Sequence, residues 1–236
     1  MKSSLVVGVA LTLLSVAAPA HAAPPPVPSE APAGCPVLTP PPTTEDLERY
    51  LCGDRRLGPA ELPDDGPVGG LLDGYDRLGD LTPEAFLDRW WGPDGWEYPD
   101  HMGFEVVDGE PVTEVTTLPE GWMLDRFGSP WGTFLAPAGA RYAQRALPPD
   151  SLNTWPDGPE HNYSCYEVTT AFAALTGPIA PHFEQPGGGE QVLVPAEGLS
   201  EPVDGEYARV NELLELGHLE ARPTEECVAF PGYALS

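Results

Sequence analysis

The sequence predicts an α+β fold, in which a mainly antiparallel β-sheet domain with few helices follows a small helical N-terminal module. After residue 97, short segments with strand character alternate with turns that are rich in glycine, proline and aspartate. Helical spacing of apolar residues is confined to short segments, most of them before residue 97. Hydrophobic residues make up 41% of the 236 residues, which is adequate for a core.

Residues 1–22 have the pattern of a secretory signal peptide. Lys2 precedes an apolar run over residues 5–18, and a small-residue cleavage pattern ends at Ala22. The run is shorter than the roughly 20 apolar residues that a membrane-spanning helix needs. We therefore expect a secreted, soluble protein with no membrane partner. Residues 23–42 are rich in proline and alanine and are expected to form an extended leader.

Residues 43–96 are expected to form the small helical module. Thr43 or Thr44 caps a first short helix, and Thr82 followed by Pro83 begins a second one. The aromatic face of the second helix, which includes Trp90 and Trp91, is interpreted as core packing. Residues 57–79 are interpreted as mostly loop, and their aspartates do not follow the spacing of a calcium-binding loop.

Residues 97–236 are expected to form the main domain. A hairpin over Phe104 to Val115 is predicted around an Asp108-Gly109 turn. A short edge segment is predicted at Gly177 to Ala180, because Pro178 cannot donate to a strand ladder. The remaining predictions are strands at Gly132 to Ala136, Tyr163 to Thr169 and Glu190 to Val194, and a helix over Ala208 to Leu216 ended by Gly217.

Four cysteines in an exported chain predict two disulfides. Three pairings are possible, and we favour Cys35–Cys52 and Cys165–Cys227. The first would close a short loop, and the second would tie the C-terminal tail to a strand of the core. A metal site is the rival explanation, but no CxxC pair occurs. A catalytic thiol is a further alternative.

The formal charge of −26 disfavours nucleic acid as a partner, because phosphate backbones require basic surface. An anionic ligand must be attracted by local arginines against the electrostatic repulsion that this negative charge produces. The chain has ten arginines, and Arg126, Arg141 and Arg145 fall within residues 124–194. Arginine binds phosphate and carboxylate in two-pronged fashion. The plain alternative is that Arg126 and Arg145 form ordinary ion pairs.

Gly187, Gly188 and Gly189 precede an apolar run, and residues without a Cβ allow backbone to approach a ligand closely. This segment is not a P-loop, because it lacks Gly-Lys-Ser/Thr and runs into a predicted strand. A loose surface loop is the plain alternative. His182, in the loop just before these glycines, is a further candidate for substrate contact.

Five motifs occur in order: DRFG (125–128), GTFLAP (132–137), QRALPP (144–149), YSCYEV (163–168) and GPIAPHFEQPGGGEQ (177–191). This series resembles the tuberculosis necrotizing toxin (TNT) family of NAD glycohydrolases over roughly residues 98–223. The resemblance implies an NAD(P) glycohydrolase, a hydrolase that cleaves the N-glycosidic bond to nicotinamide and that converts NAD to nicotinamide and ADP-ribose. It also implies that Arg145 and Gln191 are the catalytic pair, and that Arg126 and Phe127 line the same substrate-binding site.

Chemical roles follow from these assignments. The nicotinamide of NAD carries a positive charge and needs no strong general acid to leave, so positioning and electrostatics should supply most of the acceleration. Arg145 is expected to clamp the diphosphate, with Arg126 as a second cation. Phe127 is expected to stack on the nicotinamide ring, and Gln191 to bind a ribose hydroxyl or to orient water. Glu190 should point to the opposite face of its strand.

No cofactor and no metal site are expected, since NAD is the substrate and the histidines suggest no zinc triad. Some secreted family members bind calcium near the C-terminus, but Glu225 and Glu226 cannot be aligned with such a site. Two alternatives stay open for the helical module: that it covers the active site, and that it forms a homodimer contact. Two other functions also stay open, an ADP-ribosyltransferase toxin and a non-catalytic secreted binding module.

Overall fold

The computed structural model describes residues 33–199 and 201–229. The predicted signal peptide and the first part of the predicted leader lie outside these residues. None of the helices in the described part of the chain combines the length and the apolar character that crossing a membrane requires. The helices are α1 (Thr44–Arg49), α2 (Gly66–Gly69), α3 (Pro83–Trp90), α4 (Tyr142–Arg145), α5 (Val210–Glu215) and α6 (Thr224–Ala229).

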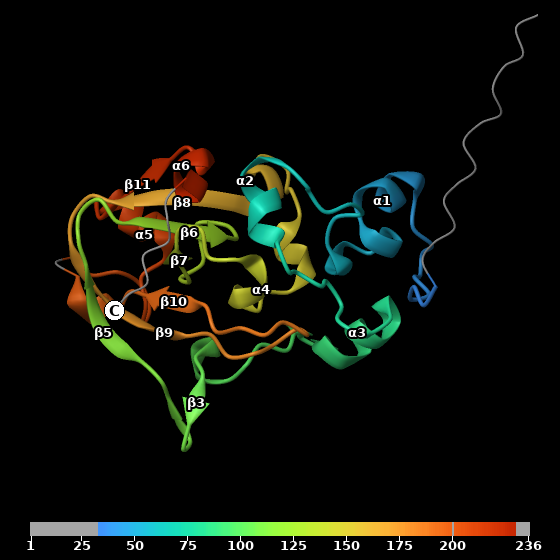
Figure 1. Cartoon of the computed structure of the whole chain (residues 1–236), viewed down its shortest axis with the longest axis horizontal. Coiled ribbons are helices and arrows are strands. Elements are labelled where there is room, and N and C mark those ends of the chain that lie inside the picture. Colours follow the sequence, from blue (N-terminus) through green and yellow to red (C-terminus); the bar gives the residue numbers. More distant parts are fainter. Residues whose placement is uncertain (1–32, 200, 230–236) are drawn as a thin grey trace, which may run out of the picture. The chain divides into compact units, whose positions relative to one another are not determined.

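The strands form two larger and two small antiparallel sheets, which confirms the predicted α+β class (Figure 1). The four-stranded sheet has the order β11-β8-β6-β7, and the three-stranded sheet has the order β10-β9-β5. Their strands are β5 (Glu114–Leu118), β6 (Met123–Phe127), β7 (Ala136–Pro137), β8 (Tyr163–Val168), β9 (Phe172–Pro178), β10 (Glu190–Leu193) and β11 (Leu219–Arg222). The small sheets pair β1 (Trp91–Gly92) with β2 (Gly95–Trp96), and β3 (Val106–Val107) with β4 (Glu110–Pro111).

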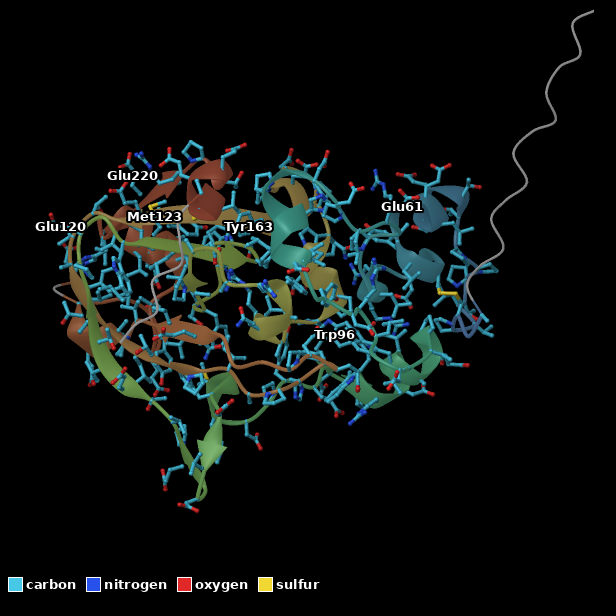
Figure 2. All side chains as sticks on the ribbon, viewed as in Figure 1. Glu61, Trp96, Glu120, Met123, Tyr163 and Glu220 are labelled. Atoms are coloured by element: carbon cyan, nitrogen blue, oxygen red, sulfur yellow. A yellow bond between two sulfur atoms is a disulfide. The ribbon has the colours of Figure 1, made fainter. Side chains whose placement is uncertain are left out.

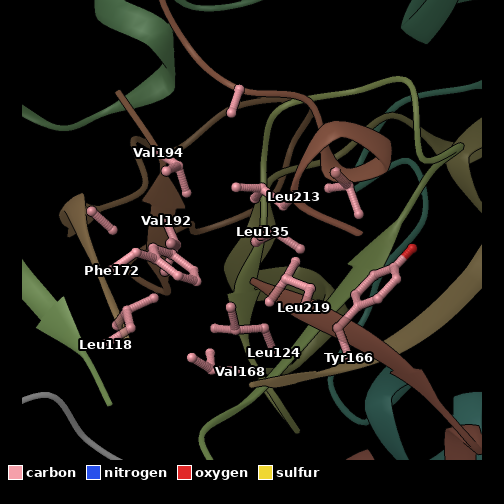
Figure 3. Packing of buried hydrophobic residues seen from close by; sticks show 13 residues of the cluster. Leu118, Leu124, Leu135, Tyr166, Val168, Phe172, Val192, Val194, Leu213 and Leu219 are labelled. Carbon is pink, nitrogen blue, oxygen red and sulfur yellow. The ribbon is translucent and has the colours of Figure 1, made fainter. Parts of the chain in front are cut away.

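The main apolar core joins the two larger sheets. It contains Leu118 of β5, Leu124 of β6, Val168 of β8, Phe172 of β9 and Val192 of β10, all buried (Figure 3). Helix α5 covers this core through Val210 and Leu213. Burial of these side chains is the dominant favourable contribution to folding. It also fixes the relative positions of β6 and β10, which line one cavity.

A second core covers the other face of β6 and β8. It packs Met123, Phe127 and Tyr163 against α2, α4 and α6, whose contributions include Val68, Tyr142 and Cys227. Every residue of β6 except Arg126 is therefore buried. A strand that is covered on both faces offers a fixed frame for the polar side chains that it carries.

The contacts between residues 33–96 and the rest of the described chain include three hydrogen bonds from tryptophan and asparagine side chains. The Trp96 indole (Figure 2) donates to Oδ2 of Asp150 at 3.0 Å, and the Trp90 indole donates to Oε1 of Glu184 at 3.1 Å. Asn153 Nδ2 donates to the Arg55 carbonyl at 2.8 Å. The described residues belong to one compact unit, and the predicted boundary near residue 97 stays a prediction.

Local signals placed the three predicted helices correctly. Thr43 caps α1, where its hydroxyl accepts from the Asp46 N–H at 3.1 Å and the Asp46 side chain reaches back to the Thr43 N–H. Thr82 caps α3, with Pro83 in the first turn. Helix α5 is followed by Gly217 at φ 71°, the left-handed conformation expected after a helix end.

Two strand predictions need correction. Gly132 to Ala136 is mostly loop, and only Ala136 enters a strand, because the preceding backbone bends around the Arg126 side chain. Gly177 and Pro178 do not form a separate edge segment, since they end β9, whose preceding residues lie between β10 and β5. Pro178 is tolerated there because the pairing with β5 stops at Thr176.

The predicted hairpin is also shorter than expected. Its turn is confirmed, with Asp108 at φ 55° and Gly109 at φ 87° between β3 and β4. The following residues leave the hairpin, however, and Glu114–Leu118 pairs with β9 instead. The strands β1, β2, β6 and β11, and most of β9, were not predicted. Both disulfides are confirmed as Cys35–Cys52 and Cys165–Cys227.

Candidate active site

One cavity of about 650 Å³ lies between β6, β10, the C-terminal end of α4 and the loops around them. Arg126, Phe127, Arg145 and Gln191 all line it. The four residues that the sequence predicts for the site are therefore brought together, although up to 65 positions separate them in the chain (191 − 126). The volume is within the range that is typical of small-molecule sites.

Arg145 ends the short helix α4, and its side chain is buried against Asp125 of β6. Its Nη2 lies 2.6 Å from Asp125 Oδ1, and the side chains are 4% and 0% exposed. Arg145 Nε and Nη2 also donate to the Ala140 carbonyl at 3.1 and 2.8 Å. The guanidinium is therefore fixed in position at the cavity wall, with one amino group, Nη1, left over by these contacts.

Asp125 is held by further donors. The Tyr163 hydroxyl donates to Asp125 Oδ2 at 2.8 Å, and the Gly139 N–H donates to the same oxygen at 3.1 Å. Burial raises the pKa of the Asp125 carboxyl, and the Arg145 guanidinium opposes this shift. Burial also raises the pKa of the Tyr163 hydroxyl, so this group keeps the proton that it donates. Breaking such a buried pair is strongly destabilising.

Arg126 organises the loop that follows β6, which we call the rim loop (residues 128–135). Its Nε donates to the Ser129 carbonyl at 2.8 Å, and its Nη1 donates to the Phe134 carbonyl at 2.6 Å. A Cβ at Gly128 would lie 2.7 Å from Arg126 Nη2, and a Cβ at Gly132 would overlap the same atom. The glycines of the DRFG and GTFLAP motifs thus make room for this guanidinium.

Phe127 lines the cavity, but its ring is well enclosed. The Arg145 guanidinium lies 5.2 Å from the ring centroid, and the Tyr142 and Tyr163 rings lie at 4.9 and 4.8 Å. Phe127 is 4% exposed. The predicted stack on nicotinamide stays a prediction, and the structure offers more exposed rings for stacking.

Gln191 of β10 is buried and has a fixed amide orientation. Its Nε2 donates to the Met102 carbonyl at 2.8 Å. This bond supports the tight turn His101–Gly103, in which all three residues have positive φ, at 55°, 57° and 83°. Since Nε2 is used in this way, Oε1 is the atom that Gln191 can offer to a ligand. Gln191 lines the cavity, and its neighbour Glu190 does not.

Several large apolar side chains around the cavity are exposed. Tyr98 and Met102 lie on one part of the lining, and Trp131 and Phe134 lie on the rim loop. Trp131 is the most exposed of them, at 67%. Exposed aromatic rings next to a cavity are suited to stacking on planar ligands.

The glycine run has a different role from the one expected. Gly187 and Gly189 donate to the carbonyls of Ala143 and Gln144 in α4, at 3.3 and 3.0 Å. A Cβ at Gly189 would lie 2.7 Å from the Gln144 carbonyl oxygen. These glycines do not line the cavity. Their close approach supports the helix that carries Arg145.

His182 also lies outside the cavity lining. Its Nε2 bonds to the Glu97 carbonyl at 2.6 Å, and its ring lies 4.4 Å from that of Trp90. The described residues contain no group of three or more His, Cys, Asp or Glu side chains that would hold a metal ion. Asn162, which begins an Asn-Tyr-Ser sequence, is buried.

Sequence reasoning missed three residues of the site: Asp125, Tyr163 and Trp131. Asp125 carried a usable signal, because a carboxylate that is buried in a strand needs a partner, and Asp125 directly follows two apolar residues in the segment MLDRF (123–127). Tyr163 and Trp131 carried none, since nothing local distinguishes a tyrosine in a core strand or a tryptophan in a loop.

This chain is similar to several known proteins. The model of the family described as tuberculosis necrotizing toxin matches residues 117–221. The conidial surface nicotinamide adenine dinucleotide glycohydrolase nadA of Aspergillus fumigatus is 45% identical over 170 residues, which cover 70% of this chain and 73% of that protein. The solved structure of tuberculosis necrotizing toxin complexed with its immunity factor is similar at 24% identity and a TM-score of 0.48, covering 69% of this chain and 88% of that one.

Proposed function

This chain belongs to the tuberculosis necrotizing toxin family, and from this premise we propose that it is an NAD glycohydrolase. It cleaves the bond between nicotinamide and ribose in NAD, adds water to the ribose carbon, and releases nicotinamide, ADP-ribose and a proton. The observation that carries the proposal is the gathering of Arg126, Phe127, Arg145 and Gln191 on one cavity. The relative that is 45% identical is named for the same activity.

The reaction needs little acid–base help. Nicotinamide leaves NAD as a neutral ring because the bond that breaks ends on a positively charged nitrogen. The ribose passes through an oxocarbenium-like state, as in other glycoside cleavages. The protein's task is to hold the dinucleotide, to stabilise charge and to admit one water molecule.

Arg145 binds the diphosphate through Nη1, the amino group that Asp125 and Ala140 leave over. The buried ion pair with Asp125 fixes the guanidinium before substrate arrives, so little side-chain entropy is lost on binding. Arg126 supplies a second positive charge through Nη2, since its Nε and Nη1 are used by the rim loop. In a chain with a formal charge of −26, these two cations are the local attraction for an anionic ligand.

Gln191 accepts a hydrogen bond through Oε1, because its Nε2 is committed to the Met102 carbonyl. The donor is a hydroxyl of the nicotinamide ribose or the attacking water. An amide whose orientation is fixed by a second bond positions its partner more precisely than a free side chain.

The substrate class extends to NADP. The additional phosphate of NADP lies on the adenosine half, away from the bond that is cleaved. The protein acts outside the cell that makes it. This localisation is supported by the two disulfides, by the leader pattern of residues 1–22, and by the surface location that the name of the fungal relative gives for that protein.

The test is to incubate the purified protein with NAD and to follow nicotinamide and ADP-ribose by chromatography. We expect Arg145→Ala and Gln191→Ala each to lose at least about 100-fold in kcat/KM, the scale of losing a transition-state contact. Arg141→Ala is the matched control, because Arg141 precedes the same helix but makes an exposed ion pair with Asp73. Near-normal turnover in both cavity variants would refute these roles.

Thermal unfolding of each variant belongs to the same experiment. Loss of Arg145 leaves Asp125 buried without its cation, which lowers stability as well as activity. Arg145→Lys keeps a charge near Asp125 but loses the planar guanidinium. It is expected to recover more stability than activity.

A further inference from the structure

The rim loop is held by hydrogen bonds to Arg126, to helix α5 and to strand β10. From inside, Arg126 binds the carbonyls of Ser129 and Phe134. From α5, the N–H groups of Asn211 and Val210 donate to the carbonyls of Pro130 and Gly132 at 2.9 and 3.0 Å.

The far end of the loop joins the sheet. The Leu135 N–H donates to the Val192 carbonyl at 3.0 Å, and the Val192 N–H donates back at 2.9 Å. Val192 adjoins Gln191 in β10. The loop backbone is thereby fixed relative to the residue that we propose to contact the ribose.

Trp131 lies between two of these anchored positions and contributes nothing to the anchoring contacts named above. Its side chain lines the cavity and is 67% exposed. Tryptophan is the largest apolar side chain, and leaving it exposed forgoes a large favourable burial. A rigid backbone carrying an exposed indole at a cavity mouth is a prebuilt stacking surface.

The burial of Arg145 and Gln191, compared with the exposure of Trp131, indicates which half of NAD contacts the Trp131 ring. Arg145 and Gln191 are 6% and 8% exposed, so the bond that breaks belongs in the enclosed part of the cavity. The adenine ring is at the opposite end of the dinucleotide and extends toward the exposed part. Trp131 is the most exposed aromatic residue of the lining.

We infer that Trp131 stacks on the adenine ring of bound NAD and determines the preference for a dinucleotide over nicotinamide mononucleotide. This inference rests on the proposed glycohydrolase function. Stacking of a base on an aromatic side chain is tolerant of base identity, because every base presents a π-face. Trp131 therefore contributes affinity for the adenosine half and takes no part in bond cleavage.

Steady-state kinetics of Trp131→Ala and Trp131→Phe with NAD and with nicotinamide mononucleotide test the inference. For Trp131→Ala, we expect KM for NAD to rise about 10-fold, with kcat nearly unchanged, which is the scale of one base–aromatic stack. Trp131→Phe should recover most of the affinity. The values for nicotinamide mononucleotide should not change in either variant.

The matched control is Trp155→Ala, because Trp155 is also partly exposed but lies in a separate hollow with Tyr50 and His161. It should leave the kinetics with both substrates unchanged. An equal loss on both substrates, or a fall in kcat with KM unchanged, would overturn the adenine assignment. So would wild-type kinetics in Trp131→Ala. Failure of the wild-type protein to cleave NAD would instead refute the proposed function.

Discussion

Single residues in this site act mainly by fixing other residues. Asp125 and Tyr163 hold Arg145, Arg126 holds the rim loop, and Gln191 holds the turn at Met102. The proposed substrate contacts of Arg126, Arg145 and Gln191 are thus atoms that are left over after structural bonds are made. Sites whose side chains are fixed in advance lose less entropy when the ligand binds.

Gly132 tests this view of Arg126. The Cβ of Gly132→Ala would overlap Nη2 of Arg126, and Gly132 does not have positive φ, so the effect of the substitution is steric. We expect kcat/KM to fall about 10- to 100-fold, because displacement of a positioned group by about 1 Å is enough for such a loss. Rates with NAD and thermal unfolding curves would measure the effect.

Gly198→Ala is the control for this substitution. A Cβ at Gly198 has no neighbour within 4 Å, and its φ is not positive either. It should be nearly neutral in both measurements. Equal kinetics for the two alanine variants would contradict the assigned role of Arg126.

At the scale of elements, two short pieces carry most of the geometry. Strand β6 bears Asp125, Arg126 and Phe127 in succession, and it is covered by apolar cores on both faces. Helix α4 has only four residues, so it depends on tertiary contacts such as those from Gly187 and Gly189. The contact between Trp96 and Asp150 joins the N-terminal helices to the segment that follows α4.

Asp150 makes the stability of that contact depend on pH. Burial raises the pKa of its carboxyl from 3.8 to about 6, and the hydrogen bond from the Trp96 indole opposes the shift. Below pH 4 both the folded and the unfolded state are protonated, and above pH 6 both are ionised. The contribution of this group to the free energy of unfolding therefore falls as pH rises through this window.

The corresponding variant is Asp150→Asn, which cannot ionise. Relative to the wild type, it should gain roughly 2 to 3 kcal/mol between pH 4 and pH 7, since one pKa unit corresponds to about 1.4 kcal/mol. Denaturant unfolding at several pH values would measure the difference. A difference that stays constant over this range would show that Asp150 does not titrate as described.

The elements also show why prediction from the sequence was uneven. Helices α1, α3 and α5 were predicted because capping residues and glycine act locally. Strand β6 was missed because a strand that is buried on both faces has no alternation to detect. The loop at Gly132 was mistaken for a strand because its course depends on Arg126, which is a tertiary contact.

The site residues were found through the order of the motifs rather than through their spacing. Arg126, Phe127, Arg145 and Gln191 do line one cavity. Their neighbours Asp125 and Tyr163 escaped notice, since burial and partnership are properties of the folded chain.

At the scale of the whole molecule, charge opposes the ligand. The formal charge is −26, and the two phosphate charges of NAD outweigh its single pyridinium charge. The long-range field therefore repels the substrate, whereas the attraction of Arg126 and Arg145 acts at short range within the cavity. Salt screens distant charges far more than close, partly buried ones.

We therefore expect kcat/KM for NAD to rise severalfold between very low ionic strength and about 0.15 M, where the Debye length is about 8 Å. Initial rates in sodium chloride, repeated in choline chloride, would separate screening from ion-specific effects. A steady fall with added salt would mean that attraction by the arginines outweighs the global repulsion.

The disulfide Cys165–Cys227 joins β8, the strand that begins with Tyr163, to α6, the last helix of the described chain. It spans 62 positions, and a cross-link over such a distance contributes about 4 kcal/mol by loop-closure entropy. In a glutathione-buffered cytosol neither this disulfide nor Cys35–Cys52 forms. Protein that stays inside the producing cell would consequently be less stable than exported protein. The difference in redox conditions thus helps to protect the NAD of the producing cell from the enzyme.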